Sequence, residues 1–308
     1  MLTRREFTMS MIATGASASL ASLAACTAIK PANSGKLAST SSMAVDCHAH
    51  VFLRNLPMPD PRRAPSGYDA SPEDFLHRLD ANGMTHGVLV QPSFLGTDNS
   101  FLVAALRKYP ERFRGIAVVD PSITGKQLDQ LQGAGVVGIR LNQIGLPVPD
   151  FTSSAWTALL KELWYRNWQV EVHQGAQLLK PLVDPLLASG VNVVIDHFGR
   201  PDPKLGINDP GFQYLLSLGA TRRVWIKLSG AYRNGADGRG QQIALDALPL
   251  LRESYGLQQL IWGSDWPHTL FEKTAFYADQ RALLNQWLPD ASDRQTVLAE
   301  VPRKLFRF

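Results

Sequence analysis

The chain of 308 residues has only two cysteines, Cys26 and Cys47, and this scarcity excludes a disulfide-stapled scaffold. Dense runs of Lys and Arg are also absent, so nucleic acid is not expected as a partner. No Gly-x-Gly-x-x-Gly turn follows the first expected strand, which argues against a dinucleotide-binding doubly wound sheet. No period of 20 to 50 residues repeats, and this excludes a solenoid.

The N-terminal segment is typical of an export signal. Residues 1–25 begin with Thr3-Arg4-Arg5-Glu6-Phe7, continue through a short stretch of small and apolar residues, and end at Cys26. This stretch is too short and too rich in Ser, Thr and Gly for a membrane span. The paired arginines resemble a twin-arginine signal, and Leu23-Ala24-Ala25-Cys26 resembles a lipoprotein signal that would lipidate Cys26. We therefore expect export to the bacterial cell envelope or periplasm, with a possible lipid anchor at Cys26.

Alternatives to this interpretation stay open, because Arg4-Arg5 also suits an ordinary Sec signal and Cys26 could be incidental. Residues 26–43 have no core-forming pattern and are expected to form a tether. Removing residues 1–25 leaves 29 basic and 26 acidic residues, a mild net charge of +3. Residues 44–308 then suit one domain, since roughly 250 residues are typical of a (β/α)8 barrel.

Alternating strand-like and helix-like segments support that architecture. The helical patterns include residues 72–79, 154–164, 178–187 and 242–255, and glycine follows several of them. Residues 271–308 add helical segments after the last strand and are expected to cover one end. Eight apolar runs are interpreted as strands: 44–51, 86–92, 114–119, 136–142, 169–174, 192–198, 223–229 and 258–264. The fold class predicted is α/β, a single-domain TIM barrel with a parallel sheet.

Chemically capable side chains cluster at the ends of these strands, where barrel enzymes build their active sites. His48 and His50 share a face of the first strand, because side chains at i and i+2 of a strand point the same way. If the first and last strands are neighbours, Asp265 faces the same point. The other candidates at strand ends or in the loops that follow are Ser93, Thr97, Arg140, Asn142, His173, Asp196, His197, Arg200, Arg233 and His268.

Each residue alone has an ordinary structural explanation. A buried histidine is often a satisfied core residue, the arginines could lie over apolar neighbours, and Asp46 and Asp196 could orient backbone or histidines. His77 and His86 are not at strand ends and are expected to have no role in the site. The convergence of His-x-His, Asp-His and a last-strand Asp on one end of the barrel is what indicates a site.

The motif order resembles the amidohydrolase-related family of the amidohydrolase superfamily, and within it the 2-pyrone-4,6-dicarboxylate lactonase-like branch. The resemblance runs from about residue 44 to the C-terminus. It rests on His-x-His, Gln-Pro-Ser, Arg-x-Asn, Asp-His-x-Gly-Arg, Lys-x-Ser-Gly and Trp-Gly-Ser-Asp-Trp-Pro-His.

This resemblance implies that Asp265 is the general base for water and that His48, His50 and His197 polarise the scissile carbonyl. It assigns substrate carboxylates and hydroxyls to Ser93, Thr97, Arg140, Arg200 and Arg233, and Asn142 and His268 are added to this substrate-binding set. Where the pyrone lactonase has a further arginine after the fourth strand, this chain has the apolar segment 143–149. The resemblance therefore leaves a second carboxylate pocket in doubt.

His173 resembles the fifth-strand histidine of metal-dependent family members. One divalent metal, Zn or Mn, could accordingly be held by His48, His50, His173 and Asp265, although the lactonase branch is known for working without a metal. The metal and metal-independent alternatives both stay open.

The leading hypothesis is a hydrolase acting on a small lactone or related carbonyl compound, with a substrate that bears a carboxylate. One alternative is a metal-dependent decarboxylase of the same family, which would need a carboxylate held over the metal. A remote alternative is a non-catalytic binding protein of the envelope. The sequence does not indicate the oligomeric state.

Overall fold

The computed structural model of the protein describes residues 43–65 and 67–308. The expected export signal, with Arg4, Arg5 and Cys26, and residues 26–42 of the expected tether lie outside the described residues, so both stay predictions. Within the described part of the chain, no helix is both long enough and apolar enough to cross a membrane.

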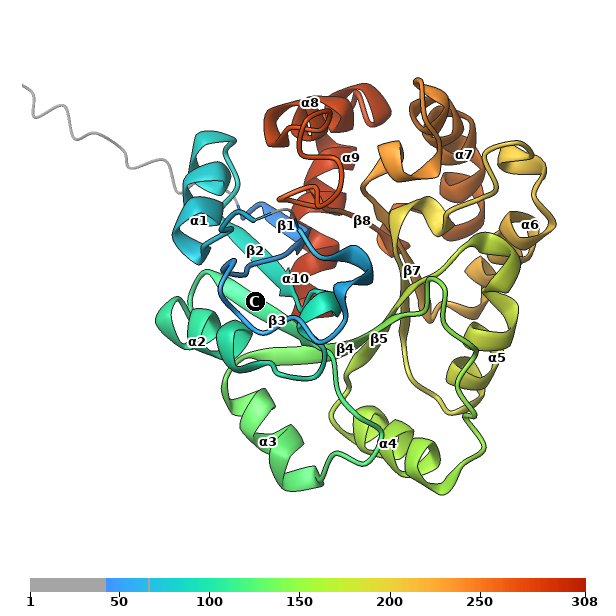
Figure 1. Cartoon of the computed structure of the whole chain (residues 1–308). Helices are drawn as coiled ribbons and strands as arrows, with labels where there is room; N and C mark the ends of the chain where they lie inside the picture. The colour runs from blue at the N-terminus through green and yellow to red at the C-terminus, as the bar shows by residue number, and fades with distance from the viewer. Residues whose placement is uncertain (1–42, 66) are drawn as a thin grey trace, which may run out of the picture. The chain divides into compact units, whose positions relative to one another are not determined.

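Eight parallel strands form a single sheet in which each strand pairs with the next along the chain (Figure 1). A parallel bridge between Ala49 and Trp266 brings the last strand back to the first. The predicted single-domain (β/α)8 TIM barrel is thus confirmed. The strands are β1 (Val45–Ala49), β2 (His86–Val90), β3 (Phe113–Ala117), β4 (Val136–Asn142), β5 (Gln169–His173), β6 (Val193–Ile195), β7 (Val224–Leu228) and β8 (Leu260–Trp262).

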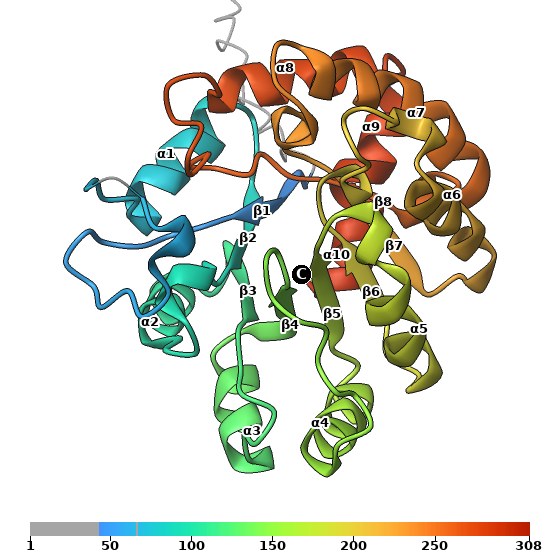
Figure 2. The ribbon, with the colours of Figure 1, turned by 45° about the vertical axis from the view of Figure 1, so that its right-hand side comes forward.

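The helices surround the sheet, as the turned view shows (Figure 2). Helix α1 starts at a capping box in which Ser71 and Asp74 bond each other's backbone N–H, as helix starts prefer. The helices are α1 (Pro72–Ala81), α2 (Ser100–Lys108), α3 (Gly125–Gly133), α4 (Ser154–Tyr165), α5 (Lys180–Ala188), α6 (Pro210–Ser217), α7 (Arg239–Tyr255), α8 (Tyr277–Trp287), α9 (Ala291–Gln295) and α10 (Val301–Phe306).

The C-terminal helix closes the amino end of the barrel. Val301 and Phe306 of α10 pack in one buried cluster with Val45, Cys47 and Val88, which come from β1 and β2. The expectation that the segment after β8 covers one end is confirmed. Because this end is filled with apolar side chains, the polar side chains of the barrel gather at the opposite, carboxyl end.

Two strands, β6 and β8, are less than half as long as the sequence predicts, and the reason lies in the site. Residues 192–198 and 258–264 were expected as strands, but β6 ends at Ile195 and β8 at Trp262. His197 and Asp265 have positive φ angles of 53° and 63°, which no strand accommodates. The backbone leaves the sheet just where these two side chains turn toward the barrel axis.

Candidate active site

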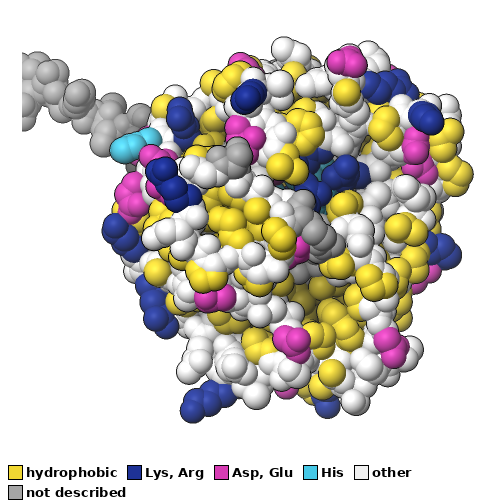
Figure 3. Space-filling model, in the orientation of Figure 1, with side chains coloured by type: hydrophobic (Ala, Val, Ile, Leu, Met, Phe, Trp, Pro, Cys, Tyr) yellow, Lys and Arg dark blue, Asp and Glu magenta, His cyan; other side chains and the backbone are white. Residues whose placement is uncertain are grey.

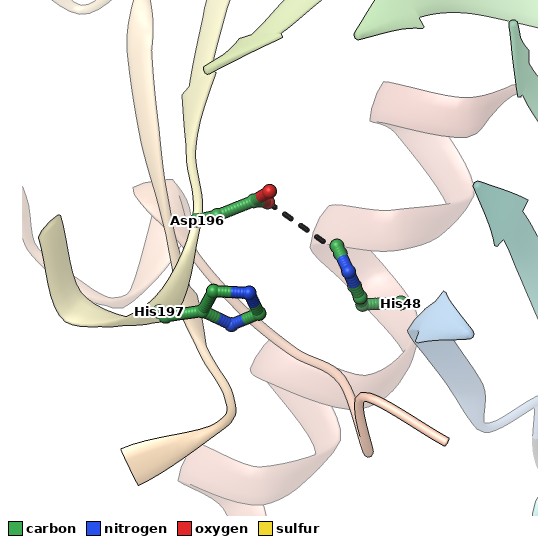
Figure 4. A group of neighbouring side chains, drawn as sticks. All are labelled: His48, Asp196 and His197. Carbon is green, nitrogen blue, oxygen red and sulfur yellow. Dashed lines mark ion pairs between the residues drawn. The ribbon is translucent and has the colours of Figure 1, made fainter. Parts of the chain in front are cut away.

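Two groups of buried histidine and aspartate side chains meet at the carboxyl end of the barrel, and His48 belongs to both. The first group is His48, His50 and Asp265, and the second is His48, Asp196 and His197. Within each group the potential ligand atoms lie within 4.8 Å of one another. Figure 4 shows His48, from β1, facing Asp196, with His197 beside them. The fold therefore brings together side chains from the first, sixth and eighth strands.

Backbone hydrogen bonds place Asp265 beside the first strand. The backbone N–H of Asp265 donates to the carbonyl oxygen of His48 over 2.8 Å. Below this contact, one carboxylate oxygen of Asp46 accepts from the N–H of His48 at 3.1 Å and of Ser264 at 2.9 Å. Asp46 thus ties β1 to the end of β8, and this fixes the positions of His48 and Asp265 relative to each other.

A glycine makes room between the sixth-strand and eighth-strand residues. Gly230 has a φ of 51°, and a Cβ atom there would lie 2.8 Å from Asp265 Oδ2 and 2.8 Å from His197 Nδ1. Such distances are shorter than a carbon can tolerate, so any larger residue would displace one of the two side chains.

We expect Gly230→Ala to lower turnover on the order of 10²-fold, since displacing a catalytic group by about 1 Å has that effect. The matched control is Gly238→Ala, because Gly238 has a φ of 78° but no atom lies within 4 Å of the place that a Cβ would occupy there. Both variants should lose about 1–2 kcal/mol of stability through left-handed strain. Urea unfolding and steady-state kinetics measure the two effects, and equal turnover in both variants would contradict the steric role.

The two oxygens of Asp265 have different surroundings. Oδ2 accepts from Nε of Arg233 at 2.5 Å and from the hydroxyl of Tyr232 at 2.7 Å. Oδ1 is buried without a hydrogen-bond partner among the described residues. It lies 3.7 Å from His48 Nε2 and 3.9 Å from His50 Nε2. One oxygen therefore holds the carboxylate in place, and the other faces the two imidazoles.

Asp265 is ionised and the imidazoles are neutral at neutral pH. Burial by itself would raise the pKa of Asp265, but the positive charge of Arg233, which forms an ion pair with the carboxylate, outweighs it and holds the pKa well below its usual value. Burial, assisted by the charge of Lys227 for His48 and of Arg140 for His50, lowers the pKa of each ring to about 3. The site thus pairs a carboxylate base with uncharged hydrogen-bonding rings.

Hydrogen bonds assign the protons of the two first-strand histidines. His50 Nδ1 lies 2.7 Å from the carbonyl oxygen of Val90, which only accepts, so this nitrogen carries the proton. His48 Nδ1 lies 2.8 Å from Nζ of Lys227, and an ammonium group only donates. His48 Nδ1 is therefore the acceptor, and the proton of His48 is on Nε2, 3.2 Å from His50 Nε2.

Lys227, Glu171 and Asp196 form a buried network of charged side chains next to His48. Nζ of Lys227 lies 2.5 Å from Glu171 Oε2 and 3.3 Å from Asp196 Oδ1. Burial raises the pKa of Glu171 to about 7, and Lys227 opposes that shift. Glu171 is not among the site residues predicted from the sequence, although its position two residues before His173 places it on the same face of β5.

A small cavity opens above this network, with a volume of about 30 Å³. Arg63 is the charged lining residue that sequence reasoning missed, since its loop between β1 and α1 carries no strand-end signal. Figure 3 shows Lys and Arg side chains gathered at a hollow on this face. The cavity is lined by His50, Arg63, Pro92, Ser93, Phe94, Arg140, Asn142, His173, His197, Arg233, Asp265 and Thr269.

Thr97 does not join this cavity, contrary to the sequence-based assignment. Its side chain is exposed and lines a separate hollow beside α2 and α3. The loop is held in that position because Nε2 of Gln91 donates to the carbonyl oxygens of Gly96 and Asp98. Ser93, which precedes this loop in the 3-10 turn η2 (Ser93–Leu95), does face the cavity.

His173 lines the cavity but belongs to neither group of clustered ligand atoms. Its Nδ1 lies 3.1 Å from Nη2 of Arg140, and its Nε2 lies 3.0 Å from Nη1 of Arg200. A neutral imidazole has one acceptor nitrogen, so one guanidinium donates a hydrogen bond to the ring and the other lies beside the ring N–H. The structure does not bring His173 into the expected ligand set, because Arg140 and Arg200 already lie against its two nitrogens.

His268 lies beside Asp265 through a shared tyrosine. The Tyr232 hydroxyl lies 3.1 Å from His268 Nδ1, and His268 Nε2 has no hydrogen-bond partner among the described residues. Burial lowers the pKa of His268 to about 4, so this ring is neutral as well.

One divalent ion fits the first group by donor type and spacing. Two imidazole nitrogens and one carboxylate oxygen lie 3.2 to 3.9 Å apart, close to the roughly 3.4 Å between ligands of a tetrahedral zinc with bonds of about 2.1 Å. His48, His50 and Asp265 would hold such an ion. His48 would then have to move its proton from Nε2 to Nδ1, toward Lys227 or toward Asp196 Oδ1 at 3.5 Å.

Residues 45–308 match the amidohydrolase family, which covers the whole barrel. The chain belongs to the amidohydrolase family. It is an enzyme, and its class is that of the hydrolases.

Among the relatives of this amidohydrolase is the 4-sulfomuconolactone hydrolase of Rhizobium radiobacter, which is 32% identical over 270 residues, 85% of this chain and 89% of the relative. The 2-pyrone-4,6-dicarboxylate hydrolase of Comamonas testosteroni is 31% identical over 85% of this chain and 90% of its own length. The crystal structure of a probable 2-pyrone-4,6-dicarboxylic acid hydrolase from Acinetobacter baumannii, with citric acid bound, is 42% identical, with a TM-score of 0.83 over 86% of this chain and 99% of that one.

Proposed function

We propose that the protein hydrolyses a small lactone that carries a carboxylate. The observation that carries this proposal is an ionised Asp265 whose Oδ1 is unpartnered beside neutral imidazoles, in a cavity lined with arginines. The relatives named above are hydrolases of lactones with acidic groups, which supports the same substrate class.

Buried polar atoms without hydrogen-bond partners are uncommon in proteins, and three of those among the described residues lie in the hydrogen-bonded group of Asp265, Tyr232, Arg233 and His268. They are Asp265 Oδ1, Arg233 Nη1 and His268 Nε2. Oδ1 is an acceptor and Nη1 is a donor. His268 Nε2 is an acceptor, because the Tyr232 hydroxyl donates to Asp265 and therefore accepts the proton of His268 Nδ1. A substrate with an ester, a carboxylate and a water molecule could satisfy all three.

The reaction begins with water beside Asp265. Oδ1 accepts a proton from the water while the water oxygen attacks the lactone carbonyl, and general-base assistance of this kind is commonly worth about 10²- to 10⁴-fold. The proton on His48 Nε2 then exchanges its contact with His50 Nε2 for a hydrogen bond to the oxyanion, near the neutral His197, whose ring centre lies 5.0 Å from that of His48. Collapse of the tetrahedral intermediate breaks the ring C–O bond, and the leaving oxygen takes the proton back from Asp265.

The substrate is held by groups that are already oriented. Arg140 is fixed by Asp196 at 3.1 Å and lines the cavity with Ser93 and Asn142. Arg200 is fixed by His173 and by the carbonyl oxygen of Arg233. Guanidinium groups suit a substrate carboxylate because they donate two parallel hydrogen bonds. When a divalent ion is bound, it supplies Lewis-acid polarisation of a carbonyl.

Proton release from a panel of lactones, measured beside CO₂ release from aromatic acids, tests the proposal. Proton release without CO₂ supports hydrolysis, whereas CO₂ release alone would assign the decarboxylase alternative. Absence of both, with tight binding of the same acids, would assign a non-catalytic binding protein. The lactone relatives and the free Oδ1 of Asp265 favour hydrolysis over both alternatives.

We also propose that the protein is exported through the twin-arginine route and lipidated at Cys26, because Arg4-Arg5 and Leu23-Ala24-Ala25-Cys26 match those signals. Replacing Arg4 and Arg5 by Lys should abolish export, and Cys26→Ser should release the protein from the membrane fraction. Fractionation with immunoblotting measures both. Delivery of the Lys-Lys variant through the Sec route would contradict the first part, and unchanged membrane association of Cys26→Ser would contradict the second.

A further inference from the structure

The cavity contains more positive than negative charge. Five cations lie in, beside or below it, against the three carboxylates Glu171, Asp196 and Asp265. Arg63, Arg140 and Arg233 line the cavity, Arg200 contacts the lining residue His173, and Lys227 lies below in the charged network. The carboxylates are each paired: Arg140 with Asp196 at 3.1 Å, Arg233 with Asp265 at 2.5 Å and Lys227 with Glu171 at 2.5 Å. Two arginines, Arg63 and Arg200, have no partner among these three carboxylates.

Arg63 and Arg200 form no ion pair within the described part of the chain, and only Arg200 is oriented by hydrogen bonds. Burial, together with repulsion from Arg233, Arg140 and Arg200, lowers the pKa of Arg63 to about 10. An uncompensated cation in a half-buried place is costly unless an anion joins it. The excess positive charge therefore favours the binding of an anionic ligand near Arg63.

The surroundings of Arg63 define where that anion would lie. Arg63 belongs to the short turn η1 (Pro61–Arg63), and Arg233 is the neighbouring cation with the largest effect on it. Arg233 uses Nε for Asp265 and Nη2 for the carbonyl oxygen of Thr269, but its buried Nη1 has no partner among the described residues. An unpartnered buried donor on one cavity-lining arginine, together with a second lining arginine that has no ion pair among the described residues, makes a built anion site.

We propose that Arg63, together with Nη1 of Arg233, binds a second anionic group of the substrate and thereby selects lactones that carry two acidic groups. This inference rests on the proposed function. Segment 143–149 after β4 has no cation that could do the same. Arg63 lines the cavity from the β1–α1 loop instead. Arg140, which also lines the cavity, is left for the first carboxylate.

Binding of two non-reactive ring acids tests the inference directly. Isophthalate and benzoate differ by one carboxylate, and calorimetry gives the affinity of the full chain for each. The wild-type protein should bind isophthalate at least tenfold more tightly than benzoate. Arg63→Met should weaken isophthalate binding by about 10- to 100-fold, a loss typical of one charge-assisted pair, and leave benzoate binding within twofold.

Arg54→Met is the matched control. Arg54 lies in the same loop, but its side chain is 61% exposed and pairs with Asp69 at 3.0 Å. This variant should bind both acids like the wild type. Arg63→Lys keeps the charge but loses the planar fork, so it should fall between wild type and Arg63→Met for isophthalate. An equal loss for both acids, or no loss for either, would overturn the assignment of Arg63.

The outcome is distinguishable from failure of the proposed function. Should no lactone be hydrolysed while Arg63→Met still loses isophthalate selectively, the hydrolase proposal fails and the two-anion site stands. Should a lactone with one acidic group be hydrolysed as efficiently as its two-acid analogue, with both values unchanged in Arg63→Met, hydrolysis stands and the selection by Arg63 fails.

Discussion

Asp265→Asn should lower kcat by about 10²- to 10⁴-fold and change KM far less, because a general base acts in the transition state and not in substrate binding. The amide that replaces Oδ1 has almost no basicity, while the ring neighbours stay in place. The wild-type carboxylate is ionised at neutral pH, since the ion pair with Arg233 holds its pKa well below its usual value despite burial. Steady-state kinetics on the best lactone of the panel gives both constants.

Stability must be measured beside turnover, since Asp265→Asn leaves Arg233 without its charged partner. Breaking a buried ion pair costs about 3–5 kcal/mol, so the rate is referred to the folded fraction from urea unfolding. Asp209→Asn is the matched control, because Asp209 is 2% exposed but caps α6 away from the cavity. It should lose stability and keep its turnover. Near-normal turnover of folded Asp265→Asn would remove Asp265 from the chemistry.

His48→Ala should lower kcat by about 10²- to 10³-fold, the usual effect of removing one oxyanion donor. The hydrogen bond from Lys227 to Nδ1 puts the proton of His48 on Nε2, where it can stabilise the developing negative charge. His48→Gln is the informative companion, because its amide N–H group can reach a position near that of Nε2 and should recover part of the lost rate. Single-turnover kinetics separates this step from product release.

Chelation distinguishes donation by His48 from metal ligation. We expect dialysis against a chelator to change turnover by less than twofold, because ligation through Nε2 would put the His48 proton on Nδ1, which faces Lys227. Arginines surround the same point, and they disfavour a divalent cation. Loss of activity on chelation, with recovery on adding Zn²⁺ or Mn²⁺ and a matching metal content by elemental analysis, would contradict this expectation and assign the ion to His48, His50 and Asp265.

His173 shows why residue type does not determine a ligand set. A histidine at the end of β5 has the right type and place for a metal ligand, and the sequence cannot reveal what its nitrogens contact. In the structure, the guanidinium groups of Arg140 and Arg200 lie against its two nitrogens, at 3.1 and 3.0 Å. Residue type likewise does not determine which residues bind the substrate. The side chain of Thr97 was assigned to substrate binding, but the loop that follows β2 turns it to the surface.

The sequence by itself determined the barrel and the end at which its polar residues lie. Alternating apolar runs and helical patterns are local signals, and period-two strands put His48 and His50 on one face whatever the rest of the chain does. Sequence motifs also placed Asp265 and His197 with them.

Tertiary structure alone decided the partners of those groups. Lys227 and His48 are 179 residues apart in the chain, yet their contact sets the proton position on which the proposed mechanism depends. Arg63 comes from an irregular loop with no periodicity, so only the folded chain shows that it lines the cavity. Charge balance, proton positions and burial arise from contacts distant in sequence, and no local pattern encodes them.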